Sequence, residues 1–147
     1  IEVTVFSELY DECRDLLSED KVLLVSGGLV YDDYRGGFSI RADKVYELEQ
    51  AREVFAERLK LLLRPSELDS AARELVQSLQ AALNPYRGGH CGVLMEYHRA
   101  DATSLIRFGQ DWQIRPADAL IKRLRGLLGE DAVRVVYGRR AVESATG

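Results

Sequence analysis

The chain has 147 residues, of which 46% are hydrophobic and 30% are charged, a composition typical of a soluble protein with one domain or two small ones. Residues 1–58 hold 14 acidic and 7 basic side chains and residues 59–147 hold 10 and 13, so the two parts carry −7 and +3 within a net charge of −4. The acidic first part argues against strong, sequence-independent binding to nucleic acid. No run approaches the ~20 apolar residues of a membrane helix, so no membrane contact is expected.

The first third of the chain predicts one helix among strands. Residues 1–6 alternate polar and apolar side chains, as a half-buried strand does. Ser7 is expected to cap the helix that follows, whose apolar side chains recur at helical spacing. Residues 25–42 predict two strands around a turn at 32–37, with a bulge or a sharp bend at the pair Gly27-Gly28.

The rest of the chain predicts a connecting helix over 49–58 and then a complete small α+β unit over 59–138, because two helices can cover one face of a sheet. Its expected order is β-α-β-β-β-α-β, with strands at 60–63, 93–97, 105–108, 113–115 and 133–137, helices at 65–83 and 116–128, and a turn at 87–89. The part before residue 49 reads β-α-β-β, which leaves sheet edges open. Residues 139–147 are small and polar and are expected to form a flexible tail.

No catalytic, metal or cofactor site is predicted. His90, Cys91 and His98 lack the further ligands that a zinc site needs, so they are interpreted as turn and strand residues. Cys13 lies far from Cys91 in the sequence, which favours reduced thiols and a cytoplasmic location. The Gly-Gly pairs are followed neither by Lys-Ser/Thr nor by a helix start, so they do not predict a phosphate-binding loop.

The turn and its flanking strands carry the side chains that could contact nucleic acid. Tyr31, Tyr34 and Phe38 offer aromatic faces for base stacking. Arg35 and Arg41 offer phosphate contacts. Acidic neighbours would repel phosphate, namely Asp32, Asp33 and Asp43. The pattern alone leaves open whether this segment is a binding finger or a plain hairpin.

Two groups of motifs resemble the bacterial replicative DNA polymerase III α subunits. The first group resembles that family's OB-fold and consists of VSG at 25–27, DDYRGG at 32–37 and ARE at 51–53. The second resembles the family's last domain and includes RADA at 99–102, IRFG at 106–109, Trp112, Ile114, Pro116, Asp118 and the segment 124–129. The resemblance covers about residues 1–138 and preserves the order of two dissimilar domains.

The resemblance implies an α+β chain with a truncated OB-fold over 1–48, a connecting helix over 49–58, a domain that binds the τ subunit of the clamp loader over 59–138, and a tail over 139–147. The first two OB strands and the polymerase's catalytic domains are expected to be absent, so the resemblance implies a non-catalytic part of a nucleotidyltransferase.

The implied role is docking on τ beside the rest of the polymerase chain, with weak contact to single-stranded DNA. Candidate partner contacts are Trp112, Arg123 and Tyr137, because aromatic and arginine side chains are typical interface anchors. The alternative for Trp112 and Tyr137 is that they fill the core. The alternative for the whole chain is a free-standing single-stranded-DNA-binding OB domain of a repair or error-prone polymerase accessory protein.

Overall fold

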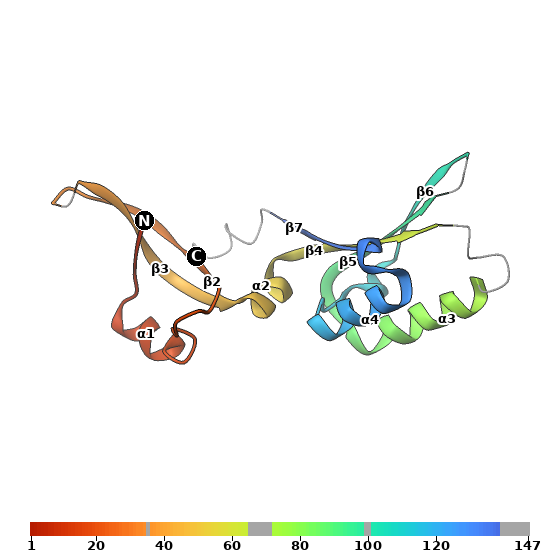
Figure 1. Ribbon diagram of the computed structural model, residues 1–147, viewed down its shortest axis with the longest axis horizontal. Helices are drawn as coiled ribbons and strands as arrows, with labels where there is room; N and C mark the ends of the chain where they lie inside the picture. The colour runs from red at the N-terminus through yellow and green to blue at the C-terminus, as the bar shows by residue number, and fades with distance from the viewer. Residues whose placement is uncertain (35, 65–71, 99–100, 139–147) are drawn as a thin grey trace. The chain divides into compact units, whose positions relative to one another are not determined.

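The chain forms an α+β fold of two compact units, residues 1–51 and 52–147, which are described separately. The structure is a computed structural model that describes residues 1–34, 36–64, 72–98 and 101–138 (Figure 1). Three expectations therefore concern residues outside the described part: Arg35 as a phosphate contact, the first turns of the helix expected from 65, and the tail at 139–147.

Unit 1 contains a three-stranded sheet with the order β1-β3-β2. Its elements are β1 (Glu2–Thr4), α1 (Ser7–Cys13), β2 (Leu23–Asp32), β3 (Gly37–Glu47) and the start of α2 (Leu48–Phe55). Strand β3 pairs in parallel with β1 and antiparallel with β2. The expected bulge is confirmed by the register shift between Ser26 and Gly27, where a Cβ on Gly27 would collide with the backbone of Arg41.

The core of unit 1 is small. Its buried apolar side chains are Cys13, Ala42 and Ala51, whereas many larger apolar side chains of this unit are exposed. The expectation that Ser7 caps α1 is wrong: Phe6 occupies the N-cap position with extended backbone, and no side chain caps the helix. The backbone turns into the helix one residue earlier than the cap preference of serine suggests, so Ser7 lies inside the first turn.

Unit 2 contains a four-stranded sheet with the order β6-β5-β4-β7. Its elements are β4 (Ala56–Leu63), α3 (Ala72–Leu83), β5 (Arg87–His98), β6 (Thr103–Arg107), α4 (Asp118–Leu128) and β7 (Val133–Tyr137). Strands β4 and β5 are parallel, as the crossover through α3 allows, and β6 and β7 pair antiparallel to them at the two edges.

Alternation along the strands gives the sheet of unit 2 one apolar face. On β4, Leu59 and Leu61 are fully buried, while Lys60 between them is not. Helices α3 and α4 lie on the same side of the sheet (Figure 1), and their apolar stripes contribute buried side chains such as Leu83 and Leu124 to one cluster with β4. No described element of unit 2 covers the other side of this sheet.

Three local expectations differ from the structure. The Gly-Gly pair at 88–89 lies inside β5 instead of forming a separate turn, because Gly89 lets the backbone of Ile114 approach where a Cβ would collide. The strand expected at 113–115 is reduced to bridges that Ile114 makes with Arg87 and Cys91. The connecting helix also ends at Phe55, since pairing with β7 extends β4 back to Ala56 and overrides the helix preference of residues 56–58.

Candidate nucleic-acid and partner surfaces

The turn that joins β2 and β3 is held by backbone hydrogen bonds. The Gly36 N–H donates to the Asp32 carbonyl at 2.8 Å, and Gly36 has a φ of 68°, which suits a residue without a Cβ. The Tyr34 N–H donates to the Asp32 side-chain Oδ1 at 2.9 Å. Asp32 therefore shapes the turn, and the Tyr34 side chain, 99% exposed, projects from it into solvent.

Tyr31 and Phe38 meet across the hairpin as a direct cross-strand pair. Their ring centroids lie 5.0 Å apart at an interplanar angle of 70°, an edge-to-face contact, and both side chains are more than half exposed. Leu29, paired with Ile40, lies on the same face of the hairpin. The two candidate stacking residues thus form part of an exposed apolar surface.

Arg41 lies on the opposite face of β3 from Phe38, because strand side chains alternate. Its guanidinium stands 5.0 Å from the ring centroid of Phe6, a cation–π contact. The structure therefore brings Tyr31 and Phe38 together but places Arg41 elsewhere, so the described candidates do not form a single binding surface.

Trp112 is held in place by its neighbours in unit 2. It ends the short 3-10 helix Gln110–Trp112 and packs against the core. Phe108 meets its ring edge-to-face with centroids 6.2 Å apart, and the Arg87 guanidinium lies 4.7 Å above it. Arg87 is itself fixed, since its Nε donates to the Asp111 carbonyl at 2.7 Å. Trp112 thus has a packing role, and a partner contact by it stays a prediction.

The other two candidate partner contacts are accessible. Arg123 is exposed on α4, and Tyr137, at the end of β7, is 55% exposed. Together with Trp112, they come from three different elements of unit 2. A partner contact by either side chain remains a prediction.

An ion-pair cluster that was not among the expectations from sequence ties the start of unit 2 to α4. The Asp118 carboxylate accepts from Arg52 Nη1 and from Lys122 Nζ, each at 2.7 Å. Hydrogen bonds from Lys122 and then from Arg52 lower the pKa of Asp118, and the bond to Asp118 is the main reason that the pKa of Arg52 is raised. The spacing of Asp118 and Lys122, four residues apart on a helix, was the available signal.

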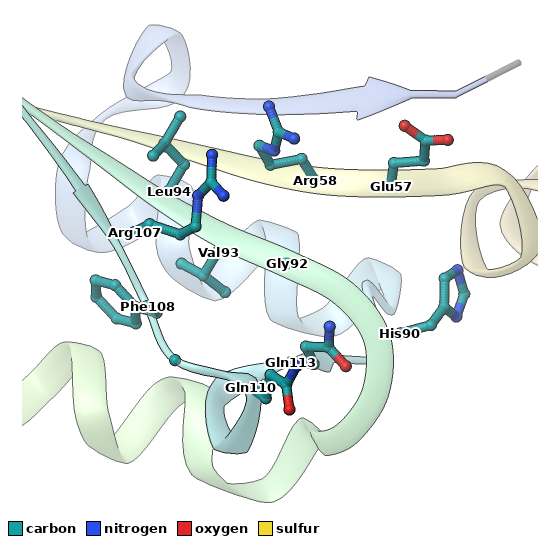
Figure 2. Close-up of a pocket in the computed structure, with 11 residues that line it drawn as sticks. Glu57, Arg58, His90, Gly92, Val93, Leu94, Arg107, Phe108, Gln110 and Gln113 are labelled. Carbon is teal, nitrogen blue, oxygen red and sulfur yellow. The ribbon is translucent and has the colours of Figure 1, made fainter.

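The side of the unit 2 sheet that faces away from the helices carries basic side chains. Figure 2 shows Arg58, Leu94 and Arg107 pointing to this side, whereas Val93 points toward the helices. These residues line a hollow of about 320 Å³, and a second hollow of about 440 Å³ has Lys60 and Arg134 among its lining residues. The sequence alone does not single out these cations, because their grouping depends on strand register.

Cys91 is fully buried in the core of unit 2. Burial raises the pKa of its thiol to about 11, and nearby Arg58 offsets this only in part. The thiol is therefore protonated near neutral pH and is not a nucleophile there. Over residues 1–34, 36–64, 72–98 and 101–138 no group of three or more His, Cys, Asp or Glu side chains could hold a metal ion.

Comparisons with known proteins agree on one family. A family model described as the C-terminal domain of DNA polymerase III subunit alpha matches residues 78–129, within unit 2. The DNA polymerase III α subunits of Escherichia coli K12 and Vibrio cholerae are 36% and 34% identical to this chain over 137 residues, which is 93% of this chain and 12% of each relative. The α subunit of Pseudomonas aeruginosa is 36% identical over the same share of this chain and 11% of its own length.

These matches define a part of a longer polymerase subunit, since the chain spans about 12% of the length of the curated relatives it matches. The chain belongs to the bacterial DNA polymerase III α-subunit family, and its residues 78–129 correspond to the C-terminal domain of that subunit. Among the described residues, no helix has the length and apolar character needed to cross a membrane.

Proposed function

We propose that the chain is a non-catalytic module of a bacterial DNA polymerase III α subunit, which works in DNA replication in the cytoplasm and docks the polymerase on the τ subunit of the clamp loader. The observation that carries the proposal is the match of the C-terminal domain model to residues 78–129, which lie in unit 2. Unit 2 supports a docking role because it has its own core and one sheet face that no described element of unit 2 covers.

Calorimetry with purified τ tests the docking proposal. The 147-residue chain is expected to bind τ, and Arg123→Ala and Tyr137→Ala are expected to weaken binding because these exposed side chains are the candidate anchors. Arg115→Ala removes another exposed cation of unit 2 and serves as the control. A folded chain that releases no heat with τ at any concentration would end this proposal.

Contact with single-stranded template is a second candidate function, favoured by the exposed aromatic side chains of the β2–β3 hairpin. The alternative, that the chain acts as a free-standing single-stranded-DNA-binding domain, rests on the same contact. Fluorescence anisotropy with an oligo-dT probe is expected to show weak, salt-sensitive binding that Tyr34→Ala and Phe38→Ala reduce. Tyr10→Ala, an exposed tyrosine on α1, is the matched control. Equal binding by all four proteins would exclude the hairpin as the contact.

A further inference from the structure

The side of the unit 2 sheet that faces away from α3 and α4 is here named the basic face. Its cations are Arg58, Lys60, Arg107 and Arg134, and its central aliphatic residues are Leu62 and Leu94. Strand register places Arg107, Leu94, Lys60 and Arg134 side by side in one row across β6, β5, β4 and β7. Three positive charges thus stand in a row that contains no acid.

This row is unfavourable for the sheet by itself. Lys60 lies directly opposite Arg134 in an antiparallel pair, and like charges in such positions repel. Within the described residues, neither side chain makes an ion pair or a hydrogen bond that would offset the repulsion. A like-charged cross-strand pair that nothing in the fold offsets points to a functional surface. An anionic ligand would neutralise the charges of this one.

The chemistry of the basic face favours a peptide over nucleic acid. Leu94 interrupts the cationic row and Leu62 lies in the next row, so the surface offers aliphatic contacts between its charges. None of its six defining side chains is aromatic, whereas sites for single-stranded nucleic acid stack bases on aromatic rings. Glu96 pairs with Leu62 on the same face and lies 3.2 Å from His98, so the positive charge of the face is confined to the cationic row and Arg58.

We propose that the basic face is the docking surface of unit 2 and that it binds an extended partner segment containing both acidic and aliphatic side chains. Carboxylates of the segment pair with the cationic row, and its aliphatic side chains cover Leu62 and Leu94. The inference rests on the proposed docking function and deepens it, because it assigns that function a surface other than the aromatic candidates.

The test measures two affinities of the 147-residue chain, one for τ and one for a fluorescein-labelled synthetic peptide of glutamate and leucine separated by serine. The double variant Lys60→Glu/Arg134→Glu is expected to weaken both by about tenfold or more, because several charge pairs are lost and replaced by repulsion. It keeps a like-charged cross-strand pair, so its stability is expected to match the parent chain. The control, Arg73→Glu/Arg115→Glu, makes the same change in net charge on exposed residues outside the face.

The outcomes separate this inference from the docking proposal. Loss of both affinities in the double variant, with the control unchanged, supports the inference. If τ binds the parent chain and the double variant equally, the basic face is excluded while docking stands. If τ does not bind but the peptide binds with the expected charge dependence, docking on τ fails and the peptide chemistry of the face is supported. If oligo-dT replaces the peptide as the charge-dependent ligand, the face binds nucleic acid and the inference is overturned.

Discussion

The pair formed by Lys60 and Arg134 predicts that a substitution on the surface of unit 2 will stabilise the fold, whereas most surface substitutions do not. Replacing Lys60 by glutamate turns a repulsive cross-strand pair into an attractive one without changing the register of β4 and β7. Lys60→Glu is therefore expected to stabilise unit 2, even though it removes a native side chain and is expected to weaken partner binding.

The size of the effect follows from the geometry of the pair. A cross-strand charge pair contributes about 0.2–1 kcal/mol, and the substitution both removes the repulsion and adds the attraction. Arg134 is exposed and Lys60 half-buried, so solvent screening holds the total to about 1 kcal/mol. For a domain of roughly 60–100 residues this raises the melting temperature by about 4–8 °C.

Thermal unfolding followed by the fluorescence of Trp112, the one tryptophan of the chain, reports on unit 2. Arg134→Glu is expected to stabilise to a similar extent, and the double variant is expected to return to the parent value. The gain should shrink in about 1 M salt, where charges are screened beyond roughly 3 Å. A Lys60→Glu chain that melts lower than the parent, or a double variant more stable than both single ones, would refute the paired register as the cause.

Three further predictions concern the core, an ion pair and a close backbone approach. Because its pKa is lowered in the fold, the Asp118 carboxylate stabilises above its unfolded pKa of about 3.9, and this contribution is lost as pH falls through the lowered value. Asp118→Asn should thus lower the free energy of unfolding at neutral pH, and the difference between variant and parent should vanish in strong acid. A difference that does not change with pH in urea titrations would contradict this. Leu124→Ala should lower the free energy of unfolding by about 2–5 kcal/mol in the same titrations. Leu127→Ala, which changes a 39% exposed residue of the same helix, should lower it less. Equal losses would show that Leu124 is not in the core. Gly89→Ala should lower the melting temperature of unit 2, because the added Cβ collides with the backbone of Ile114. Gly92→Ala is the control and should be tolerated, since its Cβ would lie 3.8 Å from the Glu57 carbonyl oxygen. The reverse order of melting temperatures would contradict the bridge at Ile114.

Local patterns in the sequence predicted most elements of the fold because each pattern has a local physical cause. Alternating leucines at 59, 61 and 63 mark the buried face of β4, and apolar side chains at helical spacing mark α3 and α4. The pair at 88–89 was misinterpreted because Gly-Gly signals a turn locally, whereas the reason for Gly89 is a backbone segment that arrives from Ile114. That approach is a tertiary contact with no local signal.

In the candidate surfaces, too, features with a local cause could be predicted from the sequence and features that depend on tertiary contacts could not. The turn expected at 32–37 is flanked by Tyr31 and Phe38, which the structure pairs across the hairpin, and strict alternation could have placed Arg41 on the other face. The row that joins Lys60 with Arg134 could not be predicted in this way. Its members lie on strands far apart in the sequence, and their register comes from the packing of the whole sheet.

The start of β4 and the end of β7 meet, and this has a mechanical consequence. Ala56, at the start of β4, pairs with Tyr137, at the end of β7, and the Gly138 N–H donates to the Phe55 carbonyl at 3.3 Å. Because the two strands are antiparallel, a force that separates these ends loads their hydrogen bonds one after another, as in a zipper, and not all at once in shear. Tension applied across unit 2 at this point would open it at low force, starting from Gly138.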